Sequence, residues 1–144
     1  MSPYRDAAHL QAILERVFRR GYTGEETSAL LHQRLALAFV ITAPDLRARV
    51  DGRDGQTAQV SFGPDTADLP ADLTFRMDGE TAHAFWSGDL NPVAAMAQGR
   101  LRVEGSLIRA LALAPGLSQM QRAYREEYAA LTAGEEGQRA AGGN

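Results

Sequence analysis

The sequence contains no cysteine, and all fifteen of its basic residues are arginines, so it also lacks lysine. Without cysteine, disulfides, thiolate zinc sites and cysteine nucleophiles are excluded, and a reducing compartment is the natural setting. Without lysine, Schiff-base chemistry is excluded. Arginine in place of lysine, together with many alanines and glycines, is typical of GC-rich bacterial genomes.

Long apolar segments are missing as well. No run approaches the roughly 18 apolar residues of a membrane span. The first ten residues carry Arg5, Asp6 and His9 and lack the apolar centre of a signal peptide. We therefore expect a cytoplasmic protein.

An excess of positive charge is also absent, since 18 acidic residues outnumber the basic ones and the net charge is −3. Nucleic-acid-binding proteins usually carry clustered basic charge, so the composition argues against a nucleic-acid partner. With 144 residues, of which 44% are hydrophobic, the chain is long enough for one domain with a sizeable core.

Apolar periodicity predicts a helix at the start of the chain. Leu10, Ile13, Leu14, Val17 and Phe18 recur at helical spacing and form one stripe. Gly21 is expected to end this helix, and residues 25–31 are expected to form a second, short helical segment.

Alternating apolar residues then predict five strands, over residues 35–41, 46–50, 58–62, 73–77 and 101–103. The first of these is apolar on both faces, which is typical of a central strand. Further helices are expected over 79–87, from 92 to Gly99, over 107–114, and from about 117 to Leu131. Asp78, Asn91 and Ser106 are the expected N-caps of the first three. The prediction is a single domain over 1–132 and a disordered tail over 133–144.

Polar side chains of the predicted strands alternate onto one face of the sheet. They are Arg47, Arg49, Gln59, Ser61, Thr74, Arg76 and Arg102. Only the other, apolar face then needs helices to cover it. The expected fold class is α+β, with a five-stranded, mostly antiparallel sheet and helices on one face.

Two segments of the chain carry a family resemblance. They are Trp86-Ser87-Gly88-Asp89-Leu90-Asn91-Pro92 and Gly99-Arg100-Leu101-Arg102-Val103-Glu104-Gly105. A turn, a helix that begins at proline and a strand bracketed by glycines follow one another in this order. The combination resembles the lipid-binding domain of the sterol carrier protein 2 family. Position 106, where the family commonly has an acidic residue, is Ser106 here.

The resemblance implies an apolar tunnel between the sheet and its helices. In the family this tunnel takes fatty acyl chains, acyl-CoA, sterols or isoprenoid lipids, and no metal or cofactor is implied. The partner expected for this chain is a hydrophobic lipid, with transient contact to a membrane or a partner enzyme. The residues expected to line the tunnel are Phe75, Met77, Phe85, Trp86, Met96, Leu101, Leu107, Leu111, Leu117 and Met120. The alternative for each of these residues is ordinary core packing.

Motifs that carry catalytic or metal-binding chemistry are missing. His9, His32 and His83 are scattered singly, without the close spacing of metal ligands. No serine lies in a nucleophile elbow, and no glycine-rich phosphate loop occurs. Three hypotheses remain open: a lipid carrier without chemistry of its own, an accessory subunit that presents a lipid to a partner enzyme, and an enzyme with acid–base residues inside the pocket. The first is preferred, so the chain is expected not to be an enzyme.

Overall fold

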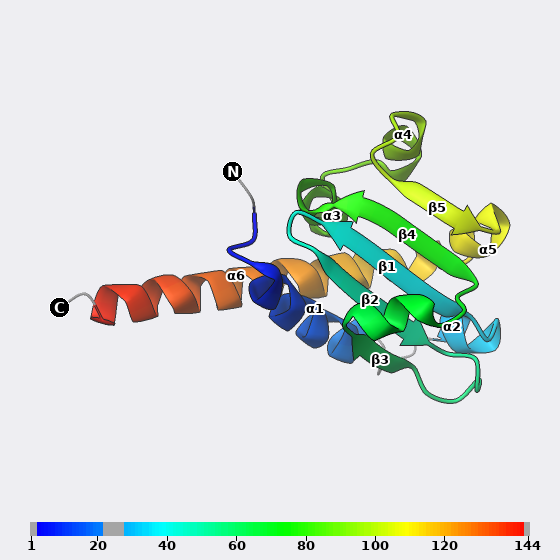
Figure 1. The fold of residues 1–144 in the computed structure, drawn as a ribbon, viewed down its shortest axis with the longest axis horizontal. Helices are drawn as coiled ribbons and strands as arrows, with labels where there is room; N and C mark the ends of the chain where they lie inside the picture. Colours follow the sequence, from blue (N-terminus) through cyan, green and yellow to red (C-terminus); the bar gives the residue numbers. More distant parts are fainter. Residues whose placement is uncertain (1–2, 22–27, 143–144) are drawn as a thin grey trace.

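The computed structural model describes residues 3–21 and 28–142, and its centre is a five-stranded sheet (Figure 1). The strands are β1 (Ala36–Thr42), β2 (Leu46–Asp51), β3 (Gln59–Phe62), β4 (Leu73–Asp78) and β5 (Arg102–Gly105). Their order across the sheet is β3-β2-β1-β4-β5. Three neighbouring pairs are antiparallel, and only β1 and β4 run parallel. The predicted fold class is thereby confirmed.

The strand that is apolar on both faces, β1, lies in the middle of the sheet, as predicted. The turn between β1 and β2 contains a cis peptide bond between Ala43 and Pro44. β1 to β3 form an antiparallel meander. The chain then returns to the other side of β1, and there the register places Phe39 beside Phe75.

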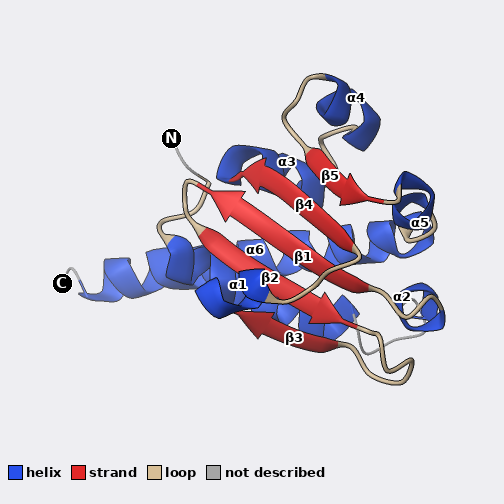
Figure 2. Ribbon diagram, turned by 45° about the vertical axis from the view of Figure 1, so that its right-hand side comes forward, coloured by secondary structure: helices blue, strands red, loops and turns tan. Residues whose placement is uncertain are grey.

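The helices of the molecule gather largely on one face of the sheet (Figure 2). The α-helices are α1 (Ala7–Gly21), α2 (Ser28–His32), α3 (Gly79–Ser87), α4 (Pro92–Ala97), α5 (Leu107–Leu111) and α6 (Leu117–Gly142). Two short 3₁₀ helices, η2 (Pro64–Asp68) and η3 (Ala114–Gly116), complete the described elements. Residues 25–27 of the second expected helical segment lie outside the described residues, while α2 accounts for the rest of it.

The three predicted N-caps are present. Asp78 Oδ1 accepts a hydrogen bond of 2.7 Å from the Thr81 amide at the start of α3. Asn91 Oδ1 accepts from the Val93 amide at 2.9 Å, and Ser106 Oγ accepts from the Arg109 amide at 3.3 Å. These contacts satisfy amides that have no partner within their own helix, and they fix where α3, α4 and α5 begin.

Two helix ends differ from the prediction. α5 ends at Leu111 rather than at residue 114, and η3 follows it. The final helix was expected to end at about Leu131 and to be followed by a disordered tail, but α6 continues through Gly142. Residues 133–142 contain three alanines, two glutamates, one glutamine and one arginine, which favour helix, beside three glycines, which do not. Residues 143 and 144 lie outside the described part, and the single-domain limits of 1–132 stay a prediction.

Arg49 lies on the predicted polar face of the sheet, but this face is not fully open to water. The segment that contains η2 crosses this face, so Arg49 is only 4% exposed. Its guanidinium donates to the Pro70 carbonyl at 2.6 Å and to Asp51 at 2.8 Å. The ion pair lets a charged side chain be buried beneath a loop.

Candidate functional site: an apolar cavity

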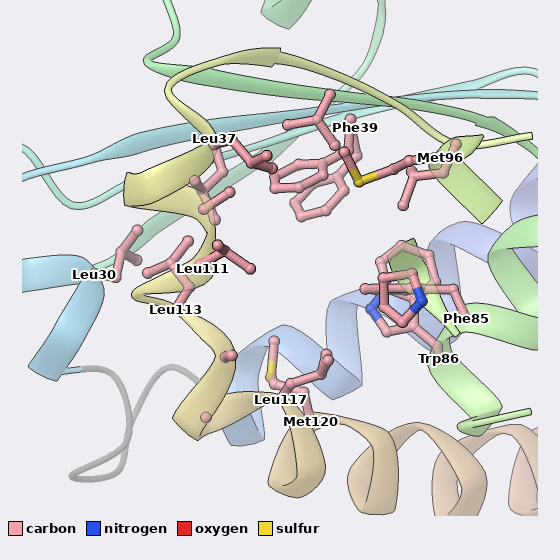
Figure 3. A pocket seen from close by; sticks show the side chains of 18 of the residues that line it. Leu30, Leu37, Phe39, Phe85, Trp86, Met96, Leu111, Leu113, Leu117 and Met120 are labelled. Atoms are coloured by element: carbon pink, nitrogen blue, oxygen red, sulfur yellow. The ribbon is translucent and has the colours of Figure 1, made fainter. Parts of the chain in front are cut away.

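A cavity of about 300 Å³ lies between the sheet and the helical layer (Figure 3). Its volume is at the lower end of the range of roughly 300–1,000 Å³ that is usual for small-molecule sites. The residues that line it are Phe18, Leu30, Leu37, Phe39, Phe75, Phe85, Trp86, Pro92, Val93, Met96, Leu101, Val103, Leu107, Ala110, Leu111, Leu113, Ala114, Gly116, Leu117 and Met120. All of them are apolar or glycine.

The two ends of the cavity differ in chemistry. Figure 3 shows the side chains of Leu30, Leu111 and Leu113 at one end and the rings of Phe85 and Trp86 at the other. Phenylalanine rings pack against one another along the wall formed by the sheet. The Phe39 and Phe75 rings are stacked 5.2 Å apart. The rings of Phe18 and Trp86 lie 5.6 and 5.7 Å from that of Phe39.

Two of the helices that border the cavity are short. α5 has five residues, so it is only about 8 Å long, and none of its residues is buried. α4 has six residues, of which only Ala95 is buried. Helices of one to two turns cannot carry a continuous apolar stripe, so α4 and α5 border the space without filling it, while α3 and α6 line its other sides.

Hydrogen bonds hold the aromatic end of the cavity in place. The Gln121 side chain donates to the Phe85 carbonyl at 3.0 Å, and Arg125 donates to the Ser87 carbonyl at 3.1 Å. Both bonds tie the end of α3 to α6. Phe85 and Trp86 are therefore presented to the cavity from a helix whose position is fixed.

A buried polar cluster lies behind Trp86, among α3, α6 and the N-terminal segment. The Tyr124 ring stacks on Trp86 at 6.0 Å. Its hydroxyl shares hydrogen bonds with Tyr4 Oη at 2.6 Å and His83 Nδ1 at 2.8 Å. Burial raises the pKa of both tyrosines and lowers the pKa of His83, because it disfavours the charged forms. This cluster stays uncharged at neutral pH, and none of its members lines the cavity.

Nine of the ten residues proposed from the sequence line the cavity; Met77 does not. Met77 has the expected inward orientation and is buried, but it lies at the end of β4, beside Ile41, and belongs to the packed core. The sequence prediction missed the other eleven lining residues, among them Phe18, Leu37 and Phe39. These three were assigned to the core stripe of the first helix and to the central strand. The pairing of β1 with β4 places Phe39 beside Phe75, and the Phe18 ring stacks on Phe39 from α1.

The described residues show no arrangement for metal binding. Within residues 3–21 and 28–142, no group of three or more histidine, aspartate or glutamate side chains is placed to hold a metal ion. In the same part of the chain, no helix combines the length and the hydropathy of a transmembrane span.

Comparison with protein families gives a match over most of the chain. Residues 14–118 match the model of the SCP-2 sterol transfer family. The chain belongs to the SCP-2 sterol transfer family. A comparison with curated protein sequences gives no match. The resemblance seen in the sequence is confirmed, and the matched residues include every residue that lines the cavity except Met120.

Solved structures share the fold of this SCP-2 family member. Sterol Carrier Protein 2 from Yarrowia lipolytica is 17% identical, with a TM-score of 0.56 over 73% of this chain and 87% of that one. A conserved hypothetical protein from Thermus thermophilus, described as possibly a sterol carrier protein, is 21% identical, with a TM-score of 0.59 over 81% and 87%. The UbiJ-SCP2 ubiquinone synthesis protein is 14% identical, with a TM-score of 0.55 over 77% and 95%. At these identities the likeness establishes the fold alone.

Proposed function

We propose that this chain binds a hydrophobic lipid in the apolar cavity and transfers it, without chemistry of its own. The observation that carries the proposal is the cavity itself. It is a space with aromatic and aliphatic walls in a member of a sterol transfer family. Methionines on two of its sides, Met96 and Met120, suit ligands of irregular shape, because the thioether side chain is flexible.

Burial of an alkyl chain supplies enough free energy for useful binding. A chain of about sixteen carbons gains roughly 13 kcal/mol at about 0.8 kcal/mol per buried CH₂. Association costs of about 4–15 kcal/mol must be subtracted. Because none of the twenty lining residues has a charged or hydroxyl side chain, the polar head of the ligand is expected to stay at the cavity mouth.

The test uses the purified, delipidated full chain and a dansyl-labelled fatty acid. Trp86 is the single tryptophan, is 2% exposed and lines the cavity, so its emission reports on this site alone. We expect energy transfer from Trp86 to the bound dansyl group, and loss of that transfer when unlabelled hexadecanoic acid is added. Absence of transfer at saturating probe would refute the proposal.

An accessory role is a second candidate, and the fold shared with the UbiJ-SCP2 ubiquinone synthesis protein favours it. In that case the chain would present its lipid to a partner enzyme rather than carry it freely. Affinity capture with the purified chain, repeated with and without bound lipid, distinguishes the accessory role from free lipid transfer. A lipid-modifying enzyme retained only by the loaded chain would support the accessory role. A chain that exchanges lipid between vesicles unaided would support free transfer.

The catalytic alternative finds no support in the cavity lining. An acid, a base or a nucleophile would have to face the bound ligand, and no lining residue has a titratable side chain. His83 is close in sequence to the lining residues Phe85 and Trp86, but its ring hydrogen-bonds to the Tyr124 hydroxyl and does not line the cavity. We therefore propose that the chain is not an enzyme.

A further inference from the structure

The indole N–H of Trp86 is the only side-chain hydrogen-bond donor among the twenty residues that line the cavity. Trp86 is 2% exposed, and a buried tryptophan N–H usually has a hydrogen-bond partner. This one has none within residues 3–21 and 28–142, where Trp86 makes ring contacts instead, to Phe18, Phe39, Phe85 and Tyr124. A buried donor without a partner calls for an explanation.

The Trp86 nitrogen is open to the cavity rather than sealed within the protein. In the described part of the chain, Arg49 Nε is the one fully enclosed side-chain nitrogen or oxygen that lacks a partner. Trp86 Nε1 lacks a partner without being fully enclosed, so it reaches open space. Because Trp86 borders the cavity at its aromatic end (Figure 3), this donor is within reach of a molecule bound there.

The direction of the indole N–H is fixed by the packing of the ring. Tyr124 stacks on Trp86 at 6.0 Å, and the Phe39 ring on β1 lies 5.7 Å away. The hydrogen bond from Gln121 to the Phe85 carbonyl holds the end of α3 against α6. A donor that is held in place before the ligand arrives loses little freedom on binding, so it can distinguish one ligand from another.

Ordered water is a poor partner for this donor. A buried water molecule makes about three hydrogen bonds, and the lining side chains offer it only one. A carboxylate is also a poor partner, since one donor does not offset the cost of burying a charge. A hydroxyl group would bring a donor of its own and leave it unpaired among apolar walls. A neutral carbonyl oxygen, which only accepts, matches the single N–H.

We propose that Trp86 is the polar recognition group of the cavity and that its indole N–H donates to a neutral carbonyl oxygen of the bound lipid. The inference rests on the proposed function and names a ligand class for it. The ligand is an uncharged lipid with a ketone- or ester-type carbonyl at the end of its apolar body that reaches Trp86. A fatty acid can still occupy the cavity with its chain, while its carboxylate stays at the mouth.

The first test is nuclear magnetic resonance of the isotope-labelled full chain. Trp86 is the single tryptophan, so its indole N–H gives one resonance of its kind. The two ligands are methyl decyl ketone and its isosteric hydrocarbon, in which a methyl group replaces the oxygen. We expect the ketone to move the indole proton downfield and to slow its exchange with water, whereas the hydrocarbon does neither. Equal responses to both ligands would overturn the inference.

The second test compares the affinities of the same two ligands, measured by displacement of dansyl fatty acid with direct excitation of the dansyl group. Trp86→Phe keeps an aromatic ring but removes the N–H, so the carbonyl is buried without a partner. We expect the ketone to be weakened about fivefold or more relative to the hydrocarbon. The matched control, Phe85→Leu, removes a ring at the same end of the cavity and keeps the indole, so both affinities should change by the same factor. Equal factors in Trp86→Phe as well would contradict the proposal.

Failure of this inference is distinguishable from failure of the proposed function. If the dansyl fatty acid and both ligands bind, but the indole proton does not respond to the ketone oxygen, lipid binding stands and carbonyl recognition is wrong. If neither the dansyl fatty acid nor either ligand binds to the wild type, the proposed function is refuted, and this inference with it. Should Trp86→Phe not fold, the resonance measurement on the wild type decides.

Discussion

The helices cover two regions of the same sheet face in different ways. The long helix α1 packs against β2 and β3 with an apolar stripe that is fully buried. The stripe consists of Leu10, Ile13, Leu14 and Val17. Next to β1, β4 and β5, residues of α3, α4, α5 and α6 border a cavity of about 300 Å³ instead. We call the residues around the cavity the hollow half, and the rest of the layer, which includes Met77 and the cluster of Tyr4, His83 and Tyr124, the packed half.

The difference between the halves lies in packing and in polar content rather than in hydrophobicity. Both use leucine, phenylalanine and methionine. In the packed half, polar groups are also buried, and they find partners, as Tyr4, His83 and Tyr124 do. In the hollow half, the lining has no polar side chain apart from the indole of Trp86. Stability and binding are therefore expected to depend on different residues.

The largest expected effect is the loss of a packed leucine. Leu14→Ala should lower the free energy of unfolding by about 2–5 kcal/mol, because it opens a cavity in a close-packed region. Leu111→Ala removes the same atoms from the exposed rim of the hollow half and should change it by less than about 1 kcal/mol. Urea denaturation of both variants checks the contrast. Equal losses would show that the two halves are packed alike.

Loss of the central hydroxyl in the polar cluster comes next. Tyr124→Phe leaves Tyr4 Oη and His83 Nδ1 without their shared partner, so we expect a loss of about 1–3 kcal/mol by the same method. Tyr128→Phe is the control. Its hydroxyl donates to the Pro3 carbonyl at 2.7 Å from a half-buried position, where water can replace it, and less than about 1 kcal/mol should be lost. A harmless Tyr124→Phe would mean that the cluster does not stabilise the packed half.

Filling the hollow half should impair binding and leave stability nearly unchanged. Ala110→Trp places a large side chain into existing space, and we expect dansyl fatty acid to bind about tenfold more weakly or worse. Ala112→Trp adds the same side chain two residues further along, at an exposed position that does not line the cavity, and should bind normally. Unimpaired binding by Ala110→Trp would place the ligand elsewhere.

The smallest expected effect is a pH dependence of the packed half. Burial lowers the pKa of His83 below its ordinary value of 6.5, so the unfolded chain takes up this proton first as the pH falls. Stability is thus lost from about pH 6.5 downward, and the Tm of the wild type should fall more steeply between pH 7 and 5 than that of His83→Gln. His32→Gln, at an exposed site, serves as the control. Carboxylates with lowered pKa, such as Asp78, are present in all three proteins and cancel in the comparison. Identical slopes for all three would exclude His83 as the source.

The sequence predicted elements better than it predicted how they meet. The stripe of α1, the five strands and the caps at Asp78, Asn91 and Ser106 follow from local patterns, and each was confirmed. The predicted alternation fails in β3, where Val60 is 37% exposed. That Phe18 lines the cavity while Leu14 does not depends on where α1 meets the sheet, which no local pattern reveals. Met77 shows the same limit. Its face of β4 was predicted correctly, but its place along the strand puts it in the packed core. The burial of Arg49 on the polar face could not be predicted, because the loop that covers it has no periodicity.

The most direct test of the difference between the halves is methyl NMR of the methionines with a fatty acid that carries a spin label near its end. Met96 and Met120 line the cavity, and Met77, in the packed half, is a built-in reference. The account predicts strong paramagnetic broadening of the Met96 and Met120 methyl signals, reversed by unlabelled fatty acid, with Met77 much less affected. Equal broadening of all three signals, or none, would contradict it.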